Sequence, residues 1–253
     1  MTAPPPTEGG AVPPQAPHPN LTGYYAAAGE RAGFVRRLFD DTAAQYDRIN
    51  SVFSLGSGAW YRRHALRRAG LRPGARVLDV ACGTGLVARE AARLTGDPAA
   101  VLGLDPSAGM LAEARRGLPV PLVQGRAEHL PLPAASVDFV TMGYALRHVA
   151  ELGTAFAEFH RVLRPGGTVL LLEIGRPEGR LGLALARAYL GHVVPALCRL
   201  RAPRSGMLMR YYWDTIEACV PAETILRHLR GAGFSGVTCE TSLGIFRAYT
   251  ARR

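Results

Sequence analysis

The chain has 253 residues, 48% of them hydrophobic, and a formal net charge of +10. This length supplies one sizeable core and is too short for two independent large domains. All 30 basic residues are arginines, scattered without a run of five, so composition bias explains the charge and a nucleic-acid partner is not expected. The four cysteines lack C-x-x-C or zinc-ligand spacing, which predicts no metal site and reduced thiols in a cytoplasmic protein.

The composition along the chain predicts a tail followed by one domain. Residues 1–30 are rich in proline and glycine and lack the apolar stretch of a signal peptide, so we predict a disordered tail. Residues 31–253 are predicted to form a single α/β domain that begins with helices. Strands alternating with helices of about 10 to 15 residues indicate a doubly wound, mostly parallel sheet. The strands are expected within residues 72–82, 99–105, 120–125, 136–145 and 168–175, with a final pair within 236–253 that turns near Gly244.

A glycine-rich turn follows the first predicted strand, in the sequence VLDVACGTG at residues 77–85. With Ala88 it reads G-x-G-x-x-A, a permitted form of the dinucleotide-binding fingerprint. Gly83 and Gly85 let the backbone turn tightly and approach a ligand closely. Asp105 ends the next strand, where a carboxylate can accept hydrogen bonds from both ribose hydroxyls of a nucleoside. The pattern therefore predicts a nucleoside cofactor at the carboxyl edge of the sheet.

Asp79 lies inside the strand that leads into this turn and discriminates between two cofactors. A dinucleotide would place its pyrophosphate over the turn, and a carboxylate about 4 Å away would oppose it by about 4 kcal/mol at an effective dielectric constant near 20. S-adenosylmethionine instead carries a sulfonium and an α-ammonium, which Asp79 would attract. The sequence thus favours S-adenosylmethionine, although Asp79 and Asp105 can also cap the helices that follow them.

Further motifs along residues 34–250 occur in a recognisable order. They are FDDTAAQYDRINSVFSLG (39–56), LDVACGTG (78–85), RAEHLPLP (126–133), YALRHV (144–149), RVLRPGG (161–167), YYWDTIEACVP (211–221), LRGAGFSGV (229–237) and SLGIFRAYTA (242–251). In this order they resemble the ubiquinone/menaquinone-biosynthesis C-methyltransferase family, within the class I methyltransferases. The first motif together with YALRH narrows the resemblance to this family, because the middle motifs occur in many methyltransferases.

The resemblance implies a seven-stranded sheet whose last strand is antiparallel. It implies methyl transfer from S-adenosylmethionine to a ring carbon of a reduced quinone or related phenol. It also implies the residues that contact the cofactor: Tyr46, which would close over it, Thr84, Asp105, the backbone of Arg126 and Ala127, and Gly143.

The chain departs from the family pattern at three places. Arg126 stands where the family usually has an acidic or amide residue, so adenine recognition is expected from backbone groups or Glu128. Gly58 and Ala59 replace a His-Arg pair, and His148 replaces the asparagine of a Leu-Arg-Asn motif. The last two changes are expected to face the acceptor.

Methylation of a phenolic carbon needs a group that stabilises the phenolate and a base that removes the ring proton. We predict Arg147 for the first role and His148, a residue that titrates near neutrality, for the second. The alternative for His148 is a surface residue that caps the next helix. The helical insertion 178–217 is expected to cover a small hydrophobic aromatic or isoprenoid acceptor and to touch a membrane surface through its arginines.

Other functions stay open on the sequence alone. A secondary-metabolite methyltransferase acting on carbon, oxygen or nitrogen of a phenol, indole or polyketide fits the same cofactor motifs. A nicotinamide-dependent oxidoreductase conflicts with Asp79, and the chain has no lysine for a Tyr-x-x-x-Lys pair. Nucleic-acid methyltransferases that modify amino groups usually carry Asn/Asp-Pro-Pro-aromatic where this chain has GYALRH. A non-catalytic binding protein on the same fold is a further alternative, because cofactor binding does not prove transfer.

Overall fold

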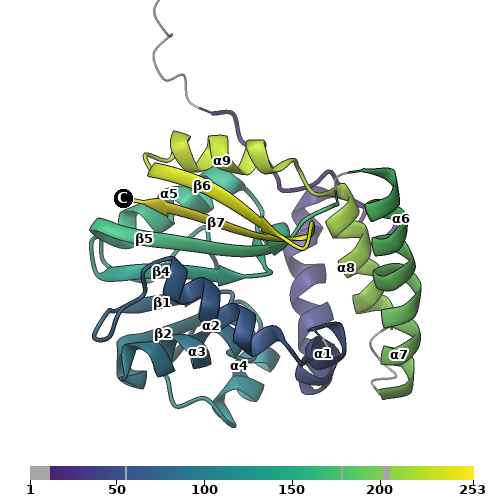
Figure 1. Ribbon diagram of the computed structural model, residues 1–253, viewed down its shortest axis with the longest axis horizontal. Coiled ribbons are helices and arrows are strands. Elements are labelled where there is room, and N and C mark those ends of the chain that lie inside the picture. Colours follow the sequence, from purple (N-terminus) through teal and green to yellow (C-terminus); the bar gives the residue numbers. More distant parts are fainter. Residues whose placement is uncertain (1–11, 55, 178, 202–205) are drawn as a thin grey trace, which may run out of the picture.

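The computed structural model describes residues 12–54, 56–177, 179–201 and 206–253. One seven-stranded sheet, in the order β3-β2-β1-β4-β5-β7-β6, runs through the described chain (Figure 1). Its strands are β1 (Val77–Val80), β2 (Val101–Asp105), β3 (Leu122–Gln124), β4 (Val137–Gly143), β5 (Leu163–Ile174), β6 (Ser235–Ser242) and β7 (Phe246–Arg252). β7 pairs antiparallel with β5 and β6, and the other neighbours pair in parallel. The predicted sheet with an antiparallel last strand is confirmed.

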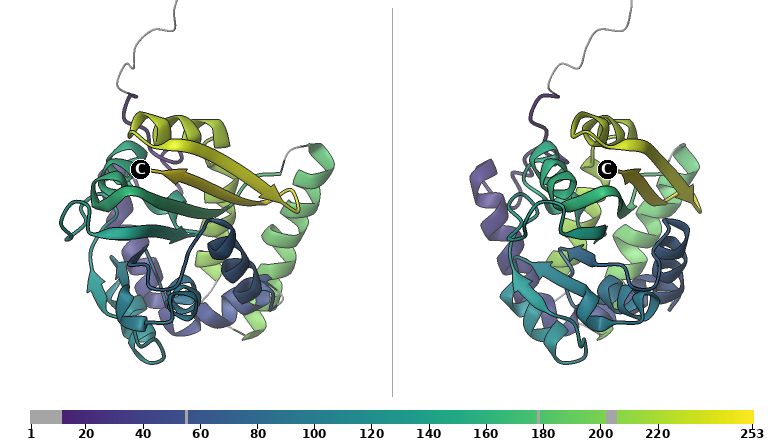
Figure 2. Two further views of the ribbon diagram at one scale, coloured as in Figure 1. Left: turned by 60° about the vertical axis from the view of Figure 1, so that its left-hand side comes forward. Right: turned by 90° about the vertical axis from the view of Figure 1, so that its left-hand side faces the viewer.

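Helices cover both faces of this sheet and one of its ends (Figures 1 and 2). The α-helices are α1 (Arg31–Ser54), α2 (Gly58–Arg68), α3 (Leu86–Thr95), α4 (Ala108–Arg115), α5 (Leu152–Val162), α6 (Arg180–Ala188), α7 (Val194–Arg201), α8 (Gly206–Ala218) and α9 (Ala222–Gly231). Shorter helical turns are η1 (Ala28–Glu30), η2 (Pro98–Ala100), η3 (Leu146–His148) and the π-helical η4 (Tyr189–Val193). Figure 2 shows the β6–β7 hairpin along one side of the molecule, next to α9.

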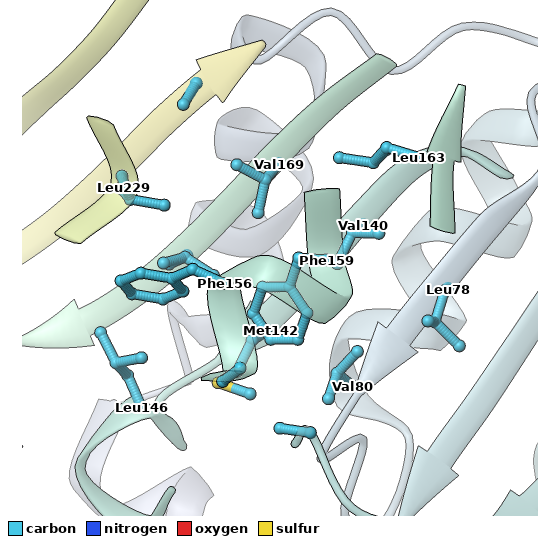
Figure 3. Packing of buried hydrophobic residues seen from close by; sticks show 14 of the residues in the cluster. Leu78, Val80, Val140, Met142, Leu146, Phe156, Phe159, Leu163, Val169 and Leu229 are labelled. Atoms are coloured by element: carbon cyan, nitrogen blue, oxygen red, sulfur yellow. The ribbon is translucent and has the colours of Figure 1, made fainter. Parts of the chain in front are cut away.

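Two apolar layers hold the sheet between its helices. Because side chains alternate along a strand, Leu78 packs into the layer that contains α5 and α9, whereas Val77 packs into the layer that contains α2 and α3. Figure 3 shows Phe156 and Phe159 of α5 among the strand residues of the first layer, with Leu229 of α9 beside them. This two-sided burial fixes the strands, and with them the loops at their carboxyl ends.

The N-terminal segment differs from its prediction. Residues 12–30 pack on the domain: His18 is only 1% exposed, and the Leu152 N–H at the start of α5 donates to the Gln15 carbonyl (2.9 Å). The Val220 N–H likewise donates to the Pro17 carbonyl (2.8 Å), so backbone groups of neighbouring elements fix the segment. The predicted disorder is therefore wrong for residues 12–30, and residues 1–11 lie outside the described residues.

A helical subdomain stands at one end of the sheet, where Figure 1 shows α1, α6, α7 and α8 together. Its core joins Leu38 and Ile49 of α1 to Leu208 and Ile216 of α8, and to Ile174 at the end of β5. The predicted helical insertion is thus observed as α6 to α8, apart from residues 178 and 202–205, which lie outside the described residues. In the described ranges, no helix has the length and apolarity needed to cross a membrane.

Candidate active site

Three neighbouring spaces share lining residues, two of them at the carboxyl ends of β1 and β4 and one beside the ends of β5 and β6. A first cavity and a second cavity each measure about 400 Å³, and a small chamber of about 30 Å³ shares lining residues with both. Tyr46 and Tyr144 line all three spaces. The predicted cofactor residues divide between the first cavity and the chamber: Tyr46, Gly83, Asp105, Arg126, Ala127 and Gly143 line the first cavity, and Asp79 and Thr84 line the chamber.

The turn after β1 has the left-handed backbone that its glycines predict. Gly83 has φ 57° and Gly85 has φ 84°, and Ala81 shares this region at φ 54°. A Cβ atom on Gly83 would meet nothing within 4 Å, so this glycine leaves open space beside the first cavity. A Cβ on Gly85 would lie 2.3 Å from Leu118 Cδ2, so Gly85 serves close packing and does not line the cavities.

Asp105 is fixed at the end of β2 by backbone donors. The Gly83 N–H donates to its Oδ2 and the Ser107 N–H donates to its Oδ1, both at 2.8 Å. Burial raises the pKa of Asp105 to about 6, so the side chain is mostly ionised at neutral pH. Each carboxylate oxygen keeps a free lone pair for a ligand hydroxyl. This arrangement suits the ribose of a nucleoside.

Asp105→Ala should therefore weaken binding of S-adenosylhomocysteine by about 1.5–3 kcal/mol, the usual contribution of hydrogen bonds to a charged group. Isothermal titration calorimetry measures this change, and circular dichroism checks that the variant is folded. Asp97→Ala is the matched control, because Asp97 caps η2 and lines none of the three spaces. If a folded Asp105→Ala variant binds S-adenosylhomocysteine with unchanged affinity, Asp105 does not bind the ribose.

Asp79 presents an unsatisfied carboxylate oxygen to the chamber. The Ala88 N–H donates to Oδ2 (2.9 Å), whereas Oδ1 is buried and has no hydrogen-bond partner among the described residues. Burial raises the pKa of Asp79 to about 8, and the Ala88 N–H and the charge of Arg62 act against this shift. A buried acceptor without a partner is costly, and a cationic ligand group would satisfy it. The α-ammonium of S-adenosylmethionine fits this position.

Arg126, Ala127 and Glu128 line one part of the first cavity. Arg126 Nε pairs with Glu128 (3.4 Å), and the Arg126 side chain is about half exposed. That backbone groups or Glu128 contact the adenine stays a prediction.

Tyr46 and Tyr144 stand where the three spaces meet. Tyr144 follows β4 with φ 62°, a left-handed conformation that is uncommon for a bulky residue, and its N–H donates to the Leu172 carbonyl (2.6 Å). Burial raises the pKa of both phenols, so both remain protonated at neutral pH. Tyr144 was missed from the sequence, although it begins the YALRH motif.

Arg147 is not where the predicted phenolate-stabilising role requires it. Its side chain is fully buried, forms an ion pair with Glu173 and lies over the Tyr212 ring, with Cζ 4.5 Å from the ring centroid. Although burial opposes the charge, Glu173 raises the pKa of Arg147. Arg147 lines none of the three spaces. This burial and pairing favour a structural role for Arg147 over the predicted contact with the acceptor.

His148 lines the first cavity, but the prediction that it titrates near neutrality is wrong. Burial, together with the charges of Arg147 and Arg31, lowers its pKa well below the ordinary value. Its ring stacks on Tyr211 (5.6 Å between centroids) and meets Phe39 edge-on (5.2 Å). Neither ring nitrogen has a hydrogen-bond partner among the described residues. The geometry favours an aromatic wall residue over a general base or a surface helix cap.

We therefore expect His148→Asn to retain the wild-type pH profile of methyl transfer, with a change in rate of less than about tenfold, because loss of a general base costs about 10²–10⁴. The measurement is the initial rate from pH 6 to pH 9 at saturating cofactor. Loss of the rising limb in the variant would restore His148 as the base.

Two polar residues outside the earlier predictions also shape the site. Asp40 Oδ1 accepts hydrogen bonds from Ser107 Oγ (2.6 Å) and the Gly109 N–H (2.8 Å), which ties α1 to the start of α4. Arg62 of α2 lines both the chamber and the second cavity. Asp40 belongs to the first sequence motif, whereas Arg62 had no comparable signal because it stands in an arginine-rich helix.

These features define a class of protein. They are typical of a class I methyltransferase with S-adenosylmethionine as cofactor. The features are a seven-stranded sheet with one antiparallel strand, a glycine turn after β1, an acid at the end of β2 and an unsatisfied buried carboxylate. The sequence profile of the ubiE/COQ5 methyltransferase family matches residues 26–251, so the chain belongs to this family.

Individual relatives agree with this assignment. The chain is 34% identical over 207 residues to the ubiquinone/menaquinone biosynthesis C-methyltransferase UbiE of Coxiella burnetii, covering 79% of this chain and 82% of the relative. It is 33% identical over 241 residues to UbiE of Edwardsiella ictaluri, covering 91% and 94%.

Solved structures show the same fold at lower identity. A SAM-dependent methyltransferase of Aquifex aeolicus has a TM-score of 0.55 at 20% identity, covering 75% of this chain and 88% of that one. One of Mesorhizobium loti has a TM-score of 0.54 at 23% identity, covering 75% and 96%.

Proposed function

We propose that the protein transfers a methyl group from S-adenosylmethionine to a ring carbon of a reduced quinone held in the second cavity. One observation carries this proposal: two cavities of similar size meet at Tyr46 and Tyr144, and only the first contains the ribose-binding acid. The relatives from Coxiella burnetii and Edwardsiella ictaluri are named for quinone C-methylation, which supports a quinone acceptor here.

The second cavity has the character of an acceptor site. Its walls are mainly apolar and aromatic, and they include Ile174, Met209 and Phe246. Trp60 and Leu243 also line it and are 67% and 87% exposed. Apolar residues exposed at the margin of an apolar cavity suit a ring that carries an apolar tail.

The residues act mainly by positioning. When bound, S-adenosylmethionine supplies a methyl group that leaves its sulfur without the bonding electrons and forms a bond to the ring carbon. Tyr46 and Tyr144 line both cavities and can hold the two partners in line, which is a large share of catalysis for such a transfer. The ring carbon then loses its proton to water or to the imidazole of His64, which lines the second cavity.

The test is an anaerobic assay with S-adenosylmethionine and a demethylated naphthohydroquinone, read by mass spectrometry of the extracted product. Ser242→Trp narrows the second cavity and should raise the KM for the acceptor by about 10-fold or more, because overpacking costs about 1–3 kcal/mol. Its affinity for S-adenosylhomocysteine should stay unchanged.

Ser235→Trp is the control, because Ser235 is exposed on the same strand and lines none of the three spaces. Equal KM values for the two variants would contradict the second cavity as the acceptor site. If the protein methylates another phenol but not the naphthohydroquinone, the proposal of a quinone acceptor is wrong.

We also propose a cytoplasmic protein that touches a membrane surface to reach such an acceptor. Leu181 and Leu185 of α6 are 75% and 62% exposed, and Arg180 adds positive charge beside them. Wild-type protein should sediment with vesicles containing anionic lipid, and Leu181→Ser with Leu185→Ser should sediment less. Equal sedimentation of both proteins would contradict membrane contact through α6.

A further inference from the structure

We propose that Arg62 binds the carboxylate of the cofactor's amino-acid end, while Asp79 binds its ammonium. Arg62 would then be a cofactor-binding residue that neither the glycine turn nor the acid at the end of β2 indicates. The inference rests on S-adenosylmethionine as the cofactor and is independent of which acceptor is methylated.

Arg62 is a buried cation whose hydrogen-bonding capacity is only partly used. Its side chain is 6% exposed, its Nη2 donates to Asn50 Oδ1 (3.3 Å), and its Cζ lies 5.5 Å from the centroid of the Tyr144 ring. Its Nε–H is buried without a partner in the described part of the chain. A buried guanidinium with an unsatisfied donor calls for an anion, and a carboxylate matches its geometry.

The chamber is therefore lined by a cation with an unsatisfied donor and by a carboxyl group with an unsatisfied oxygen, which can ionise when a cationic group binds. Arg62 and Asp79 both line it, and Arg62 acts to lower the pKa of Asp79. No ion pair within 4.0 Å joins these two described residues. The α-amino acid end of the cofactor carries an ammonium and a carboxylate on one carbon atom. Such a zwitterion would satisfy both side chains at once.

Gly58 makes room for this position of Arg62. A Cβ atom at Gly58 would lie 2.7 Å from Arg62 Nη1 and 3.1 Å from Ser54 Oγ. Gly58 is one of the positions at which the chain departs from its family's sequence pattern. The departure thus coincides with space for the guanidinium.

Ligand truncation tests the proposal. Calorimetry compares S-adenosylhomocysteine with 5′-methylthioadenosine, which lacks the amino-acid end. Arg62→Ala should weaken the binding of S-adenosylhomocysteine by about 10- to 100-fold. It should change the affinity for methylthioadenosine by less than about 3-fold, because only the first ligand carries the carboxylate. Asp105→Ala should weaken both ligands, because both contain the ribose.

Arg63→Ala is the matched control, because Arg63 is the next residue of α2, pairs with Glu90 (2.7 Å) and lines none of the three spaces. It should bind both ligands like the wild type. Arg62→Lys keeps the charge and should retain part of the affinity for S-adenosylhomocysteine. Gly58→Ala should displace Arg62 and so weaken the binding of S-adenosylhomocysteine but not that of methylthioadenosine. This variant tests the proposal if Arg62→Ala does not fold.

Other outcomes would overturn the proposal. Equal weakening of both ligands by Arg62→Ala would make Arg62 a structural residue. Unchanged binding of both ligands with a lower rate of methyl transfer would instead assign Arg62 to the acceptor, since it also lines the second cavity. If the wild type binds neither ligand, S-adenosylmethionine is not the cofactor, and this proposal fails with that assignment.

Discussion

Arg147→Ala should lower the free energy of unfolding by about 3–5 kcal/mol, because it leaves Glu173 buried without its cationic partner. Burial already raises the pKa of Glu173, and the Arg147 charge opposes that shift. Glu173 Oε1 also accepts the Leu146 N–H (2.7 Å), so the pair fixes the turn that follows β4. Chemical denaturation followed by circular dichroism measures the loss.

The double variant Arg147→Met with Glu173→Leu separates charge from packing. It removes both ions and should recover most of the lost stability, because apolar replacement of a buried pair is often close to neutral. A stable Arg147→Ala protein with only a lower rate of methyl transfer would contradict the structural assignment and support the role that the sequence suggested.

Asp79→Asn should weaken S-adenosylmethionine binding by about 2–5 kcal/mol, the usual cost of truncating one partner of a buried charge pair. The amide keeps the size of the side chain, and its oxygen can still accept the Ala88 N–H, so the turn after β1 should persist. Asp138→Asn is the control, since Asp138 pairs with Arg164 and lines none of the three spaces. Wild-type affinity in Asp79→Asn would contradict the ammonium site.

The same carboxyl should make cofactor binding depend on pH. With a pKa of about 8, Asp79 holds a proton in the free protein at pH 7, and the arriving ammonium favours the ionised form. Binding should therefore release a proton, and the affinity should rise by up to about tenfold per pH unit between pH 6 and pH 8. Calorimetry in buffers of different ionisation enthalpy should count about one released proton for the wild type and none for Asp79→Asn.

Much of the fold follows from local patterns. The apolar segments around Leu78 and Val140 are bounded by Pro-Gly or turn residues, and the alternation of strands and helices dictates a parallel sheet. The glycine turn and Asp105 could be placed at one edge because ligands bind at the carboxyl ends of such strands. The antiparallel β7 came from family resemblance, since local pattern shows only that two strands end the chain.

The errors came from contacts between residues far apart in the chain. The sequence places Arg147 and His148 just after a strand, which suggests an accessible edge. In the structure, Thr215 of α8 accepts from the Arg147 Nε–H (3.4 Å), and Arg31 donates to the Arg147 carbonyl. His18 completes this cover by contacting Arg31 (2.8 Å). No periodicity near residue 147 signals such partners, so burial and the lowered pKa of His148 were not predictable from the sequence.

The most direct test of the account follows a ¹³C-labelled methyl group from S-adenosylmethionine into the product of a demethylated naphthohydroquinone. Carbon-bound and oxygen-bound methyl groups resonate in separate ranges of the carbon NMR spectrum. We expect methylation of carbon, seen as a carbon-bound label and a product that reoxidises to a quinone. A label on oxygen, in an ether that no longer reoxidises to a quinone, would contradict it.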